Sequence, residues 1–114
     1  MNDEAIQCLK SMLEIDPKNS EAYERLGYIY EKQNMADEAI QNYQKAIEFN
    51  PNLQSNYISQ GFMYFTKNMD DEAIECLQKL IQINPKFVQA YERLGYVQQM
   101  KNMTEEAMEY KKSY

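Results

Sequence analysis

The chain has 114 residues, of which 44% are hydrophobic, and it carries a formal net charge of -6. This length suits one compact domain, and the acidic charge disfavours nucleic acid or an anionic membrane surface as a partner, because both are bound by basic faces. No apolar run approaches the ~18 residues of a membrane span and no signal-peptide pattern opens the chain, so we expect an intracellular, cytoplasmic protein.

The hydrophobic pattern predicts helices from the first residues onward. The first is expected at about residues 2–14, and two more follow at about 20–33 and 36–49. Tyr23, Leu26 and Tyr30 lie at the i, i+3, i+7 spacing of one helical face. Asn34 is expected to end this helix, because asparagine tolerates the left-handed backbone conformation. Pro51 ends the next one, since the residue before a proline avoids helical angles.

The pattern then repeats to the end of the chain. It predicts helices at about residues 54–67, 70–83, 88–101 and 104–113, with Asn68 and Asn102 at turns and Asn84-Pro85 at a helix end. Acidic pairs open the second helix of each pair, where the helix dipole favours negative charge. The sequence therefore predicts an all-α chain of seven antiparallel helices.

A period of 34 residues relates these helices. The prolines Pro17, Pro51 and Pro85 follow it, and so do the glycines Gly27, Gly61 and Gly95. Residues 22–28 recur letter for letter as residues 90–96, two periods later. Such a fixed period indicates a stack of helical repeats, in which each repeat packs on its neighbours.

The residues that recur resemble the signature of the tetratricopeptide repeat (TPR) family, which reads W-x2-L-G-x2-Y, then A-x3-F, then P. The first full repeat carries it as Tyr23, Leu26, Gly27, Tyr30, Ala39, Tyr43 and Pro51. The second carries it as Tyr57, Gln60, Gly61, Tyr64, Ala73, Leu77 and Pro85. The resemblance implies one right-handed superhelical TPR array over residues 1–114. It divides into an orphan second helix (1–19), repeats at 20–53 and 54–87, and a partial terminal repeat (88–114).

Three physical expectations accompany the resemblance. The glycines at Gly27, Gly61 and Gly95 should let the second helix of each pair approach closely. Lys111 and Gln98 are polar where the pattern wants a large apolar group, so we expect the last hairpin to fray or to act as a solvent-facing cap. At the other end, the first helix has no preceding partner, and its stripe of Ala5, Leu9 and Met12 should face solvent or another chain.

No constellation in the sequence points to catalysis. The chain has no histidine, the commonest metal ligand and proton shuttle near neutral pH. The repeated acidic pairs are explained by their place at helix starts. Cys8 and Cys76 lie in equivalent positions two repeats apart, which is too far for a disulfide and fits a reducing compartment. We therefore expect a protein that is not an enzyme and uses no metal or cofactor.

The expected binding surface lies on the first helix of each pair, since the family resemblance implies that these helices line the concave side. Tyr28, Phe62 and Tyr96 should form a ladder of rings there, one per repeat. Apolar side chains should thicken its centre, and acidic or polar ones should lie at its rim. The full candidate set is Glu24, Tyr28, Glu31, Ile58, Phe62, Phe65, Glu92, Tyr96 and Gln99.

Such a groove suits a peptide or helix of another protein that carries apolar anchors and basic flanks. Family members that bind chaperone tails clamp a terminal carboxylate with lysine, asparagine and arginine. Here Glu24, Ile58 and Glu92 lie among the corresponding positions, so that activity is disfavoured. The alternative function is a structural spacer or self-association module, in which open terminal helices join one copy to another.

Overall fold

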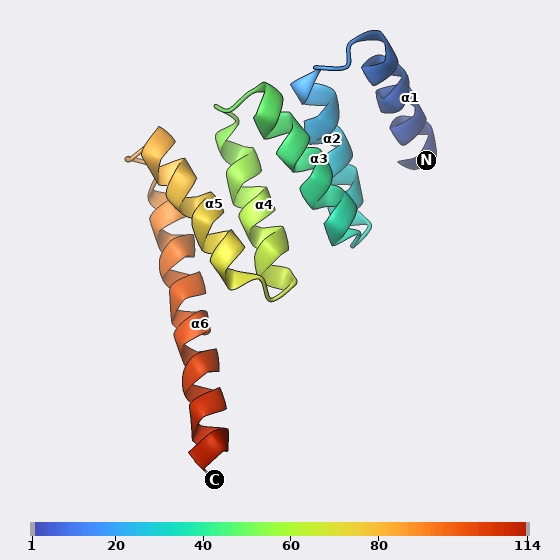
Figure 1. Ribbon diagram of the computed structural model, residues 1–114. Helices are drawn as coiled ribbons and strands as arrows, with labels where there is room; N and C mark the ends of the chain where they lie inside the picture. Colours follow the sequence, from blue (N-terminus) through green and yellow to red (C-terminus); the bar gives the residue numbers. More distant parts are fainter. Residues whose placement is uncertain (1, 114) are drawn as a thin grey trace.

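The computed structural model describes residues 2–113, and these residues form a stack of antiparallel helices (Figure 1). The helices are α1 (Asn2–Ile15), α2 (Ser20–Lys32), α3 (Ala36–Phe49), α4 (Gln54–Thr66), α5 (Asp70–Ile83) and α6 (Val88–Ser113). The all-α solenoid is therefore confirmed, and the first five helices agree with the predicted ranges to within one residue at each end. Met1 and Tyr114 lie outside the described residues.

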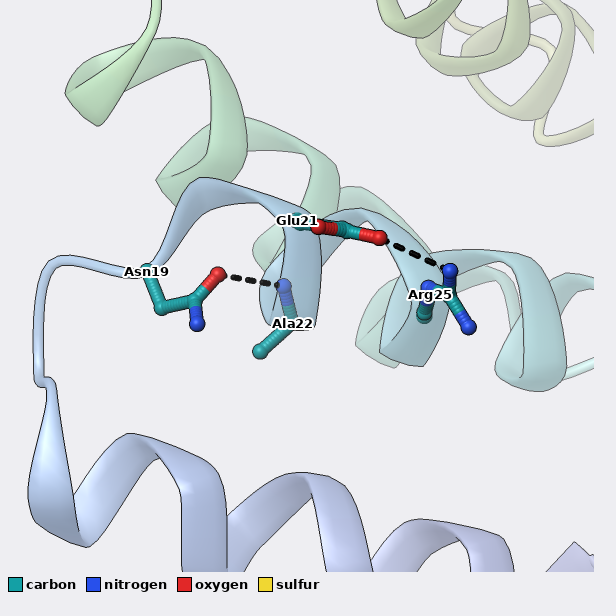
Figure 2. A network of polar contacts seen from close by, with 4 residues as sticks. All are labelled: Asn19, Glu21, Ala22 and Arg25. Atoms are coloured by element: carbon teal, nitrogen blue, oxygen red, sulfur yellow. Dashed lines mark hydrogen bonds and ion pairs between the residues drawn. The ribbon is translucent and has the colours of Figure 1, made fainter.

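Local sequence signals place the helix ends. Asn19 caps α2, because its side-chain oxygen accepts a hydrogen bond from the Ala22 amide at 3.1 Å (Figure 2). Asn34 and Asn68 adopt left-handed backbone angles, with φ of 61° and 62°, and turn the chain from α2 into α3 and from α4 into α5. The predicted roles of these two asparagines are confirmed.

In each of the two complete hairpins, the second helix packs against the first beside a glycine of the first helix. At Gly27 an added Cβ would lie 2.7 Å from the ring of Tyr43, which is buried to 2% exposure. At Gly61 the nearest atoms, from Ala73 and Leu77, would lie at 3.6 Å, an ordinary contact distance. The expected close approach is therefore tight in the first hairpin and looser in the second.

Neighbouring hairpins are joined by a cluster around Leu80, which has no exposed surface. Leu80 on α5 packs with Ile47 on α3, Tyr57 on α4 and Ala90 on α6. Side chains from four helices thus meet at one buried point, as expected when each repeat buries its apolar face against the next.

Gln60 replaces the leucine of the repeat pattern, and the structure shows how a glutamine is accommodated in the interior. It is 2% exposed, its Nε2 donates to Gln44 Oε1 at 2.9 Å, and its Oε1 accepts from the Cys76 thiol at 3.5 Å. Both ends of the amide have partners, which removes most of the cost of burying it.

The two cysteines should differ sharply in reactivity. Cys8 is exposed, whereas Cys76 is buried and its burial raises the pKa of its thiol to about 11. Because the thiolate is the reactive form, we expect a thiol-specific reagent at pH 8 to label Cys8 rapidly and Cys76 only after denaturation. Counting labelled thiols by mass spectrometry tests this. Rapid double labelling of the native chain would contradict the packing of α4 against α5.

The seventh helix predicted at residues 104–113 is wrong as a separate element. Within the described residues, α6 runs as one continuous helix of 26 residues, and Asn102 stays helical where Asn34 and Asn68 turn. A turn costs helical hydrogen bonds, and this cost is offset only if the returning helix buries apolar surface. Lys111 stands where Tyr43 and Leu77 fill the earlier hairpins, so the gain is small.

The opening stripe on α1 is also partly different from expectation. Leu9 is buried rather than solvent-facing, because it packs with Ile6 on its own helix and with Ala22 and Leu26 on α2. Met12 remains 40% exposed, and Ala5 is exposed too. The helix therefore uses Leu9 to pack against the repeat that follows it.

No helix among the described residues is long and apolar enough to cross a membrane.

Candidate functional site

The three rings of the predicted ladder lie on α2, α4 and α6 with large exposed surfaces. Tyr28 is 56% exposed, Phe62 46% and Tyr96 54%. The buried residues Leu26, Met63 and Val97 of the same three helices pack in the hydrophobic clusters instead. Three successive first helices therefore present one ring each to solvent, as the helical period predicts.

A cleft of about 340 Å³ lies between α4 and α6. Phe65 and Tyr96 meet across it edge to face, with ring centroids 5.6 Å apart. Phe62 and Ile58 form the α4 wall, and Glu92 lies on the α6 side. The full lining is Ile58, Gly61, Phe62, Phe65, Leu77, Gln89, Glu92, Arg93, Tyr96 and Val97. Five of the nine predicted groove residues meet in this one apolar cleft.

A second cleft, of about 680 Å³, lies between α1, α2 and α4. Glu24 and Tyr28 line it from α2, and Cys8 and Met12 close it from α1. Its α4 side is polar and includes Asn56, which is 2% exposed and whose Nδ2 has no hydrogen-bond partner among the described residues. The predicted groove is thus divided into one cleft between α4 and α6 and a second between α1, α2 and α4.

Two predicted residues line neither cleft. Glu31 is half-buried and accepts a hydrogen bond from the Tyr43 hydroxyl at 2.7 Å. Burial, followed by this bond to Glu31, raises the pKa of Tyr43 well above its ordinary value, so Tyr43 remains a neutral donor. Glu31 therefore supports the first hairpin. Gln99 is exposed and lies outside both clefts.

Two arginines lie among the acidic side chains of the groove, and neither was among the residues predicted for it from the sequence. Arg93 lines the cleft between α4 and α6, and Arg25 lines the cleft between α1, α2 and α4. Arg25 also pairs with Glu21 at 2.7 Å on the exposed face of α2 (Figure 2). The signal was available, because both arginines belong to the seven-residue segment that recurs two periods apart.

Lys32 adds a further positive charge beside the ladder. Its Nζ lies 5.1 Å from the centroid of the Tyr28 ring, within the range of a cation–π contact. The rim of the groove is therefore mixed in charge near α2. Within residues 2–113, no group of three or more histidine, cysteine, aspartate or glutamate side chains is arranged to hold a metal ion.

Family models match most of the chain. A model described as tetratricopeptide repeat matches residues 20–53. A second, described as TPR repeat, matches residues 2–34 and 61–102. A search of curated proteins found no match.

Solved structures with the same architecture are numerous. The crystal structure of MamA protein is 33% identical in sequence, with a TM-score of 0.81, and the match covers 96% of this chain and 60% of MamA. This chain thus spans less than two thirds of MamA.

Two more distant structures share the fold. The first TPR of Spaghetti (RPAP3), bound to the HSP90 peptide SRMEEVD, is 21% identical with a TM-score of 0.79, covering 88% of this chain and 79% of that one. A mutant O-GlcNAc transferase of Thermobaculum terrenum is 21% identical with a TM-score of 0.70, and the match covers 81% of this chain and 18% of that one.

Proposed function

Since this chain belongs to the tetratricopeptide repeat family, whose members are in general interaction modules, we propose that it binds a peptide or helix of another protein. The binding surface is the groove on α2, α4 and α6. The observation that carries this proposal is the apolar cleft between α4 and α6, with Phe62 and Tyr96 exposed at its edge. The proposed role requires no catalysis and no cofactor.

Exposed aromatic rings beside a cleft are the features that anchor a partner. Burying one such ring removes a large apolar area from water, and aromatic residues are enriched among those that dominate binding energy. Ile58 and Phe65 lie half-buried behind the exposed rings and give the cleft an apolar floor. A partner side chain the size of leucine or phenylalanine fits this environment.

The charged residues at the rim of the groove indicate the charge expected of a partner. Glu92 lines the cleft between α4 and α6, Glu24 lines the cleft between α1, α2 and α4, and the chain as a whole carries a net charge of -6. We propose that these two glutamates select a partner with basic residues flanking its apolar anchors. Arg25 and Arg93 weaken this preference locally, so the selectivity is expected to be moderate and to fall as salt rises.

Selection of peptides from a random display library against the chain tests both properties. We expect enriched peptides to carry a large apolar residue with lysine or arginine on either side. Against such a selected peptide, Phe62→Ala should lower the affinity about fivefold or more, since loss of an anchor costs more than ~1 kcal/mol. Calorimetry measures the change.

A matched control separates the groove from general stickiness. Ile15 is 87% exposed at the end of α1 and lies outside both groove clefts, so Ile15→Ala should leave peptide affinity unchanged. The acidic peptide SRMEEVD should bind the wild-type chain more weakly than the selected peptides. Tight binding of SRMEEVD would contradict the charge preference, and equal affinity of Phe62→Ala and wild type would contradict the anchor.

A further inference from the structure

Among the helices of residues 2–113, none folds back along the far half of α6. Residues 102–113 continue straight past the N-terminal end of α5 and point away from the stack (Figure 1). Met103, Met108 and Tyr110 on this segment are each more than half exposed. The segment corresponds in the 34-residue period to α3 and α5, the helices that fold back and cover a glycine in the two complete hairpins.

The surface that such a helix would cover is open on α6. A Cβ added at Gly27 or Gly61 meets atoms of the returning helix, whereas a Cβ at Gly95 meets nothing within 4 Å. Tyr91, one turn before Gly95, is 49% exposed, although its counterpart Tyr57 is buried. The chain therefore has both an empty docking face, around Gly95, and the segment that matches it in the repeat.

Folding the segment back onto its own α6 would require a turn at Asn102. That turn replaces helical hydrogen bonds by a left-handed residue, as at Asn34 and Asn68. In the structure Asn102 remains inside the helix. A second copy can supply the same segment without any turn, because its own α6 is equally straight.

We propose that two copies of this chain exchange residues 104–113, so that each segment packs antiparallel on the Gly95 face of the other copy's α6. Each chain then buries the small apolar surface that a folded-back hairpin would bury, and no helical hydrogen bonds are broken because each α6 stays continuous. Exchange of an identical element is a low-cost route to a symmetric dimer. The association costs translational and rotational freedom, so the dimer is concentration-dependent. This proposal does not depend on the peptide-binding groove.

The register of the exchange follows from the second hairpin. There an added Cβ on Gly61 would lie 3.7 Å from Cys76 Cβ. One period later, these positions are Gly95 and Tyr110. The two-fold axis then passes between Asn102 and Met103. Met108 of each copy faces the Val97 turn of the other, and the aliphatic stem of Lys111 covers Gly95 while its ammonium group reaches water.

Disulfide trapping tests the exchange directly. A Cβ separation of 3.7 Å is suited to a disulfide, so Gly95→Cys combined with Tyr110→Cys should cross-link under mild oxidation. The experiment uses a Cys8→Ser background, because Cys8 is exposed. We expect a covalent dimer. Peptide mapping should show that position 95 of each copy is joined to position 110 of the other. Each single cysteine variant should remain uncross-linked.

The other outcomes would overturn the proposal. A disulfide within one chain would mean that the segment folds back on its own α6. No disulfide at all would mean that the Gly95 face stays open.

Sedimentation analysis provides a second test without new cysteines. The wild-type chain should show a mass that rises toward the dimer with concentration. Gly95→Leu should remain monomeric at the same concentration and keep its helical content, because the added side chain fills the docking face and its Cβ meets nothing within 4 Å among the described residues. Phe62→Ala should dimerise like wild type. A wild-type chain that stays monomeric at its solubility limit, or a dimer unaffected by Gly95→Leu, would contradict the exchange.

Discussion

Replacing Leu80 with alanine should lower the free energy of unfolding by about 2–5 kcal/mol, the usual cost of truncating a buried leucine. Leu80 has no exposed surface, and it is the point where Ile47, Tyr57 and Ala90 from three other helices meet. The loss therefore weakens the junction between two repeats as well as the second hairpin. Urea unfolding followed by far-UV circular dichroism measures the change.

The shape of the unfolding curve carries further information. Repeat proteins are stabilised by each repeat and by the interface between neighbours, so weakening one interface should broaden the transition or divide it in two. Ile15→Ala is the control, because Ile15 is 87% exposed and its truncation should change stability by less than about 0.5 kcal/mol. A Leu80→Ala chain as stable as the Ile15→Ala chain would contradict the packing of the central cluster.

The three glycines provide a second large and well-controlled effect, because one chemical change can be made at equivalent positions of three repeats. Gly27→Ala should lower the stability by about 1–3 kcal/mol, since its Cβ would lie 2.7 Å from the buried ring of Tyr43. Part of this cost is offset by the better helix propensity of alanine, about 1 kcal/mol. At Gly95 no clash opposes the gain, so Gly95→Ala should be stabilising by up to about 1 kcal/mol.

Gly61→Ala should fall between these two variants, because its Cβ would make only ordinary contacts at 3.6–3.7 Å. Thermal unfolding of the three variants at low protein concentration gives the order directly. An equal loss of stability at all three positions would mean that each glycine is packed alike, and that α6 has a hairpin partner in solution.

The helical content and its period could be predicted from local sequence signals. Spacing of apolar residues, asparagine at two turns and asparagine-proline at two helix ends placed five helices to within one residue. These signals suffice because each acts over a few residues and because both complete repeats bury the surface that their sequence offers. The exposed ring ladder followed from the same period, since Tyr28, Phe62 and Tyr96 occupy one position in successive repeats.

Other features of the candidate site were beyond sequence reasoning. The division of the groove into two clefts depends on how α1 and α6 lie against α2 and α4. Glu31 was assigned to the groove by its helical position, but it holds the Tyr43 hydroxyl because the ring of Tyr43 crosses over Gly27. Side chains of neighbouring helices decide such contacts, and the period of one helix contains no information about them.

The sequence by itself determined which segments are helical and which face of each helix is apolar, because backbone preferences and side-chain spacing act locally. Only the tertiary structure decided whether a helix turns back. Asn34, Asn68 and Asn102 carry the same signal, yet only the first two leave the helix. A turn forms when the helix that follows buries enough apolar surface to offset the broken hydrogen bonds. Tyr43 and Leu77 provide that surface, and Lys111 does not.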